Sequence, residues 1–422
     1  MTITSAELIK MMKSLSQVDE WLVLETSTRR MSRTVGPAGS GEVVGRSLSA
    51  LLFRDSDTGR GSARVDLAGE DEAAAGAMLA AAAEQAALAV GPGWVLPPPA
   101  APARVEVADP EVIGNLAGVV AEMSAQLTRT RALAIVRAEL TAELITHRVA
   151  SSHEFVSEYQ ETRLSFDVTL SGGSRRRGAG RRLGAGNFFE ALDRARGHDR
   201  VRGSARPIEP ATYDLVLGPE AVAMPRFGCF APLVAQASGE RIRLGLSRYR
   251  PGQKVFARGG DDFTLVSDGT IPFGVLSAPF GPLGEPVRRF VLIEDGKAVD
   301  ASLDLREGAL AGVPPNGGVR NLVLSPGGET AAALSEPGDR PLLTVLELAW
   351  LDADPLSGDL TAEVALASLE QAGKPPAVVA GGLLSGNAYE LLGRARRSRD
   401  TGEAGWYRGP KALRIDRVEV VR

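Results

Sequence analysis

The second half of the chain consists of short apolar runs, and their spacing limits the folds that it can adopt. From Tyr213 onward, Gly and Pro interrupt these runs about every ten residues. Runs such as 214–217 and 321–324 have the length of strands and are shorter than most helices. We therefore expect a β-rich, barrel-like domain over 206–422, with a final strand at 412–421.

The first half of the chain mixes helix and strand signals. The Ala-rich stretch 70–90 favours a helix. Asp109 suits the N-cap of a second helix and Pro110 its first position, and this helix is predicted to run to Thr128. Apolar alternation predicts strands at 42–54, 132–149, 155–159 and 162–170. With a Pro-rich connector near 91–104, we expect an N-terminal mixed α/β domain over 1–205 and an α+β fold overall.

The composition is that of an ordinary globular protein. Hydrophobic residues make up 44% and charged residues 24% of the 422 positions, which is enough for well-packed cores. The net charge of −4 is too small for general attraction to nucleic acid or to an anionic membrane. No apolar stretch reaches the length of a membrane span, and no secretory signal is visible. We expect a soluble, cytoplasmic protein with no membrane partner.

Histidine and cysteine are scarce, which narrows the chemistry open to this chain. The chain has three histidines, His147, His153 and His198, and one cysteine, Cys229. On one strand, His147 and His153 would lie about 20 Å apart, and on a helix they would face different directions, so neither geometry makes a metal pair. We predict structural or surface roles for the three histidines and a buried, inert thiol for Cys229.

Five arginines gather in the Gly-rich tract 171–183. They are Arg175, Arg176, Arg177, Arg181 and Arg182. One interpretation is a solvated, mobile hairpin tip, and the other is a site that steers or holds an anionic ligand. No aromatic residue is interleaved among them, so bases would find no stacking platform and nucleic acid is a poor partner.

Several blocks of the C-terminal half resemble the TldD/PmbA (TldD/TldE) metallopeptidase family. They occur in the family's order and read YDLVLGPEAV at 213–222, FTLVSDGTIP at 263–272, LGEP at 283–286, FVLIEDG at 290–296, NLVLSPG at 321–327 and AGGLLSGN at 380–387. Catalytic members carry His-Glu-x-x-x-His on a helix after the first block and a Cys near the C-terminus, and these supply the zinc ligands. Here 220–230 reads EAVAMPRFGCF, without His, and 394–407 has no Cys.

The resemblance therefore implies the subunit type, PmbA/TldE-like, that lacks the zinc motif. It implies a heterodimer with a TldD-like zinc subunit that cleaves unstructured peptides. This chain would have no catalytic, metal or cofactor residues of its own, and the zinc would lie in the partner. The alternative, which draws on the arginine tract, is a stand-alone binding module for an anionic ligand or nucleic acid.

Overall fold

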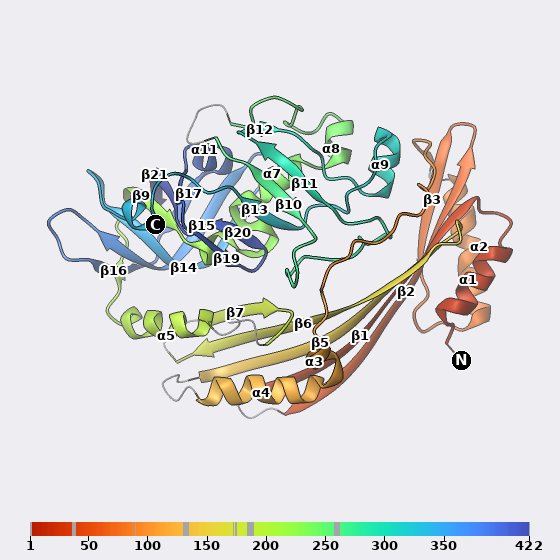
Figure 1. The fold of residues 1–422 in the computed structure, drawn as a ribbon, viewed down its shortest axis with the longest axis horizontal. Helices are drawn as coiled ribbons and strands as arrows, with labels where there is room; N and C mark the ends of the chain where they lie inside the picture. Colours follow the sequence, from red (N-terminus) through yellow and green to blue (C-terminus); the bar gives the residue numbers. More distant parts are fainter. Residues whose placement is uncertain are drawn as a thin grey trace.

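The computed structural model describes residues 2–421 apart from 36–38, 89, 130–134, 172, 174, 184–189 and 257–261. The molecule is elongated, with one long curved sheet from the N-terminal half and a compact lobe from the C-terminal half seated in its curve (Figure 1). We call these parts the N-terminal lobe and the C-terminal lobe. The expected α+β class is confirmed.

The N-terminal lobe is built on an antiparallel half-barrel with strand order β4-β3-β2-β1-β5-β6-β7. Its strands are β1 (Glu20–Val35), β2 (Ser40–Ser56), β3 (Gly59–Asp66), β4 (Val90–Gly91), β5 (Ile135–Ser151), β6 (Val156–Leu170) and β7 (Arg175–Gly180). The two strands predicted at 155–159 and 162–170 are one continuous strand, β6, because Gln160 and Glu161 keep pairing with β5.

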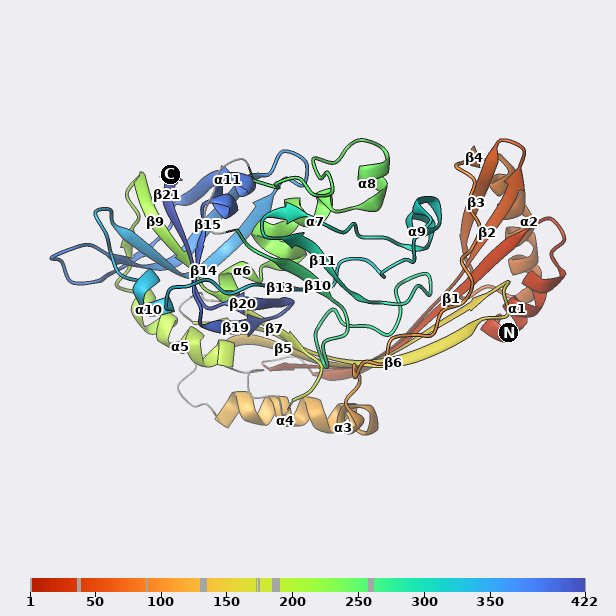
Figure 2. The same ribbon diagram turned by 45° about the horizontal axis from the view of Figure 1, so that its top comes forward.

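Helices cover the N-terminal sheet away from the C-terminal lobe (Figures 1 and 2). They are α1 (Ser5–Ser14), α2 (Glu72–Leu88), α3 (Pro110–Gly114) and α4 (Leu116–Arg129). The single helix predicted from Pro110 to Thr128 is broken at Asn115. The backbone of Asn115 leaves the helical region, and its side chain accepts the Gly118 amide N–H, which restarts the helix as α4.

The C-terminal lobe contains a closed five-stranded barrel, which confirms the barrel-like prediction. Strand β14 pairs with both β9 and β15, and this closes the order β14-β9-β21-β17-β15. The barrel strands are β9 (Ala211–Leu217), β14 (Leu342–Ala353), β15 (Asp359–Glu370), β17 (Leu383–Asn387) and β21 (Leu413–Val421). Short strands at its margins are β8 (Arg206–Pro207), β16 (Ala377–Ala380) and β18 (Arg396–Arg397).

A second sheet packs against this barrel. It consists of β10 (Leu265–Asp268), β11 (Arg289–Glu294), β12 (Lys297–Ala298), β13 (Asn321–Leu324), β19 (Thr401–Ala404) and β20 (Tyr407–Pro410). The remaining helices are α5 (Glu190–Arg202), α6 (Pro219–Val222), η1 (Pro225–Phe230), α7 (Ala231–Gln236), α8 (Gly239–Arg243), α9 (Leu305–Ala311), α10 (Ala331–Leu334) and α11 (Ala388–Gly393). Helix α5 lies between the two lobes. The domain boundary expected near residue 205 stays a prediction.

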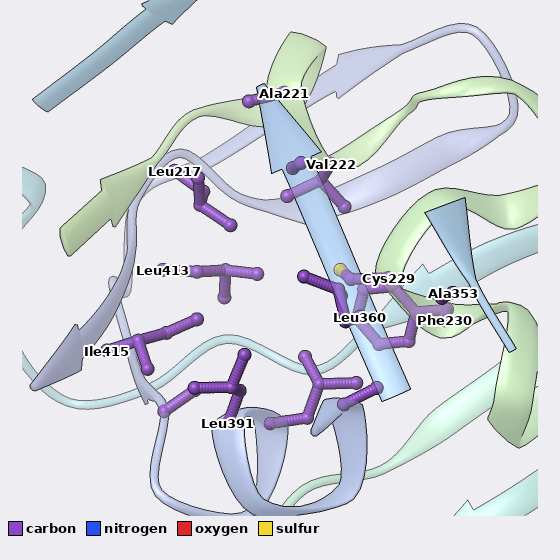
Figure 3. Packing of buried hydrophobic residues seen from close by; sticks show 14 of the residues in the cluster. Leu217, Ala221, Val222, Cys229, Phe230, Ala353, Leu360, Leu391, Leu413 and Ile415 are labelled. Carbon is purple, nitrogen blue, oxygen red and sulfur yellow. The ribbon is translucent and has the colours of Figure 1, made fainter. Parts of the chain in front are cut away.

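One apolar core unites the barrel and the second sheet. Figure 3 shows Leu413 and Ile415 of β21 facing Val222, Phe230 and their neighbours from the helical segment. These side chains are almost completely buried. The short runs of the C-terminal half therefore act together, since each contributes only a few side chains to a shared core.

In the part of the chain that the structure describes, no helix is both long and apolar enough to cross a membrane.

A buried ion pair ties the last strand of the barrel to its first. The Arg414 Nη2 atom lies 2.9 Å from Asp214 Oδ2, and both side chains are buried. Burial alone would raise the pKa of Asp214, but hydrogen bonds from the Arg417 amide and two guanidinium groups hold that pKa below its usual value. The carboxylate form is therefore the one that the fold stabilises.

We predict that Asp214→Asn lowers the free energy of unfolding by about 3–5 kcal/mol, because Arg414 is left without its full counter-charge. Urea denaturation at pH 7 measures this. The control is Glu403→Gln, which removes a pair with Arg408 that is about half exposed and should cost less than about 1 kcal/mol. Equal effects of the two substitutions would contradict the assignment.

Candidate functional site

Part of the arginine tract forms an edge strand. Residues 175–180 are β7, which pairs with β6 in a hairpin, so Arg175, Arg176 and Arg177 lie on the strand beside the hairpin turn and not in a loose loop. Arg175 and Arg177 point to the same face, and both donate to Asp167 of β6, at 2.5 Å and 2.9 Å. The hydrogen bond from Arg175 is the main reason that the pKa of Asp167 is lowered. Both arginine side chains stay more than half exposed.

Arg176 lies on the opposite face of β7 and reaches the C-terminal lobe. Its Nη2 atom is 2.8 Å from the Glu347 carboxylate of β14, which Arg202 of α5 also contacts. The same Nη2 atom lies 2.9 Å from His198 Nδ1. Burial, together with the Arg176 charge, lowers the pKa of His198, so this ring is neutral and accepts at Nδ1.

Arg181 is buried at the junction of the two lobes. Its Nη1 atom is 2.7 Å from Glu161 Oε2 of β6. Its Nε and Nη2 atoms donate to the carbonyls of Gly274 and Ser277, which belong to the loop after β10 in the C-terminal lobe. The next residue, Arg182, places its guanidinium 4.3 Å from the centre of the Phe273 ring.

Glu161 is the centre of this junction cluster. Its carboxylate also lies 3.5 Å from His147 Nε2 and 3.1 Å from Arg163 Nη2. Burial alone would raise the pKa of Glu161, but the hydrogen bond with His147 and the Arg181 charge lower it to about 2. Tyr159 stacks on His147, and burial raises the pKa of this phenol to about 12.

This electrostatic setting does not suit proton transfer. A general acid or base works best when its pKa lies near the working pH. Glu161 is held far below that range and Tyr159 far above it. The cluster therefore holds the lobes together as fixed charges.

The other histidine and the cysteine lie apart from the cluster. His153 follows β5, and its Nε2 atom is 2.6 Å from Glu20 Oε1. Cys229 is buried in the core of the C-terminal lobe, and burial raises its thiol pKa to about 12, as expected for an inert thiol. Across the described ranges, no three His, Cys, Asp or Glu side chains gather where they could hold a metal ion.

The segment that follows β9 does not fit a zinc ion. The first helix there, α6, ends at Val222, and Pro225 begins the separate turn η1. Within η1, Arg226 and Phe227 have φ values of 55° and 68°, so the chain turns sharply instead of continuing a helix. Around Cys229 the neighbours are apolar, whereas zinc ligands need polar partners that orient them.

Sequence reasoning missed a cleft where the two lobes meet. It measures about 530 Å³ and is lined by residues of β2, β3, β4 and α9. Figure 2 shows α9 opposite this end of the N-terminal sheet. Phe53, Arg60 and Trp94 form one wall, and Arg306 forms the other. No local pattern marks these residues as a set. The one signal was Trp94 in the Pro-rich connector, because a large aromatic residue in such a segment is expected to be covered.

Comparisons with known proteins agree on one family. Residues 210–422 match the family model described as the PmbA/TldA metallopeptidase C-terminal domain. No curated protein matches the chain in sequence. Similar solved structures are TldE from Thermococcus kodakarensis (TM-score 0.73, 18% identity, 99% of this chain and 100% of that one covered) and a candidate modulator of DNA gyrase from Bacteroides thetaiotaomicron (0.77, 16%, 99% of each). A third, described in the same words, comes from Thermotoga maritima (0.75, 16%, 99% of each). At these identities the likeness establishes the fold.

The junction cluster predicts unequal roles for the arginines. Arg181→Met should lower the free energy of unfolding by several kcal/mol, because Glu161 would stay buried without its partner. Arg175→Ser with Arg177→Ser should change it by less than about 1 kcal/mol, since both side chains are largely exposed. Chemical denaturation at pH 7 compares the two variants, and a similar loss in both would contradict this ranking.

The same measurement has a defined pH dependence. The pKa of Glu161 falls from 4.5 to about 2 on folding, so its contribution is complete above the higher value. It is lost as the pH falls through the lower one. The stability difference between wild type and Arg181→Met should therefore shrink over this acidic window.

Proposed function

Because the chain belongs to the PmbA/TldD metallopeptidase family, we propose that it is a TldE-like, non-catalytic subunit of a two-subunit zinc peptidase that cleaves unstructured peptides. The observation that carries this proposal is the segment 220–230. It has no histidine, its helix is interrupted at Pro225, and its one thiol is sealed in the core. The zinc would then belong to a TldD-like partner, in which bound water or the substrate carbonyl is activated.

The outer edge of β2 supports the partnership. Strand β2 pairs with β3 only over 49–56, so the edge of 40–48 has no strand neighbour in the described part of the chain. Val43 and Val44 are 58% and 71% exposed on it. Exposed strand edges of this kind pair readily with another chain. Its charges are already balanced, because Glu42 pairs with Arg29 and Arg46 with Glu25.

We predict that co-expression with a TldD-like protein carrying His-Glu-x-x-x-His yields one complex on size exclusion, with the zinc bound to that partner. Val43→Lys with Val44→Lys should weaken the complex at least about tenfold, since a desolvated charge opposes strand pairing. The control is Leu356→Lys, an equally exposed position in the β14–β15 turn. Thermal denaturation should show all variants folded.

Two results would reject the proposal. One is separate elution of the two proteins, with the TldD-like one fully active alone. The other is near-stoichiometric zinc on this chain after chelation. If the complex forms and its affinity is unchanged by the two lysine substitutions, the partnership stands and the β2 edge is not the surface that mediates it.

Steering of acidic peptides stays a prediction for the arginine tract. Arg176 and Arg181 are held by buried acids, whereas Arg175, Arg177 and Arg182 are exposed, and Asp167 balances one of the first two charges. The double change to Ser should slow cleavage of an acidic peptide by the complex at low salt and matter less at high salt. A neutral peptide of equal length is the control, and equal slowing of both peptides would argue against steering.

The alternative function, a stand-alone module for an anionic ligand or nucleic acid, has less support. Four of the five arginines already contact a carboxylate within the chain, and Arg182 faces an aromatic ring. Phosphate contacts need cationic side chains that are free to release counterions. Salt-dependent binding of a DNA or RNA oligonucleotide by the isolated chain would revive this alternative.

A further inference from the structure

The cleft between the lobes has the size and lining of a ligand site. Its volume of about 530 Å³ falls in the usual range for small-molecule pockets. Trp94 of the connector and Leu283 of the C-terminal lobe give it apolar surface, and Phe53 of β2, which is buried, packs beneath Trp94. Figure 1 places α9 opposite β3, and residues of both lobes line the cleft there.

Arg60 in this cleft is already neutralised. Its guanidinium bonds to both Glu20 and Asp55, and it lies 5.5 Å from the Phe53 ring centre and 5.3 Å from that of Trp94. The Arg60 hydrogen bond is the main reason that the pKa of Asp55 is lowered, so this pair is fully charged. Arg60 therefore fixes the aromatic wall and does not offer a free charge.

Arg306 in the opposite wall differs from Arg60. Within the described residues, no acid pairs with its guanidinium, and its Nε atom is buried without a hydrogen-bond acceptor. Its Nη2 atom extends toward Gly91 of β4, where an added Cβ atom would be 3.5 Å away. Asp304 also lines the cleft, but no ion pair joins it to Arg306, and its Oδ1 atom accepts the Glu307 amide N–H at the start of α9.

We propose that this cleft binds the α-carboxylate of an apolar residue, with the carboxylate on Arg306 and the side chain against Trp94 and Leu283. The two Nη atoms of a guanidinium match a carboxylate through two parallel hydrogen bonds, and no acid within the described residues already occupies those of Arg306. The carboxylate can belong to a peptide's C-terminal residue or to a free amino acid, whose ammonium would lie near Asp304. The occupant that we propose is the C-terminal residue of a peptide. This proposal extends the proposed function and depends on it only for the peptide as the source of the carboxylate.

Isothermal titration of this chain alone tests the site with an unstructured heptapeptide that ends in Phe. Saturable binding is expected, at least about tenfold weaker for the C-terminal amide of the same peptide and for Arg306→Gln. Trp94→Leu should weaken binding of the free acid. Arg64→Gln, an exposed arginine on β3, is the matched control and should bind as wild type.

The outcomes separate cleanly. Equal binding of acid and amide, or no saturable binding, overturns the site. Free phenylalanine that binds as tightly as the peptide keeps the carboxylate site and overturns the peptide as its source. Because no partner is present, a negative result here leaves subunit pairing standing, and failure to pair leaves a positive result here standing. Circular dichroism of each variant confirms that lost binding is not lost folding.

Discussion

The buried guanidinium of Arg181 sets how the two lobes meet. An arginine cannot lose its charge, so burying it requires an acid and acceptors for its other donors. Glu161 of β6 provides the acid, and the loop carbonyls of Gly274 and Ser277 provide acceptors from the C-terminal lobe. Neither the acid from the N-terminal lobe nor the carbonyls from the C-terminal lobe would alone satisfy the charge and all the donors of Arg181. The buried guanidinium therefore joins β6 of the long sheet to the loop after β10 of the C-terminal lobe.

The same demand for partners explains why a run of arginines is compatible with a folded edge strand. Alternation on β7 directs Arg175 and Arg177 to one face and Arg176 to the other. On the first face, Asp167 forms ion pairs with both arginines. On the second face, Glu347 of the C-terminal lobe forms an ion pair with Arg176. Like charges that look repulsive along the sequence are thus separated by the pleat, and each is next to an acid. Of the three arginines of β7, Arg175 and Arg177 remain largely exposed to solvent.

Local patterns predicted the elements but not their partners. The run 321–324 was predicted to the residue, because strand pattern and flanking turn residues agree there. The break at Asn115 depends on one amide side chain, and periodicity alone does not reveal it. For Arg181 the acceptors lie 93 and 96 positions along the chain, so no local signal distinguishes it from its exposed neighbours. Arg306 was missed for the same reason.

The segment after β9 is held by apolar packing. Val222, Phe230 and Leu233 are buried there, and the Phe230 ring lies 6.4 Å from that of Tyr407 in β20. Packing therefore fixes this stretch of the chain. An added histidine would need a second polar group to orient it, and the buried neighbours here are apolar. The sharp turn at Pro225 and the apolar core around Cys229 thus depend on each other, because the turn places Phe230 and Leu233 where they fill that core.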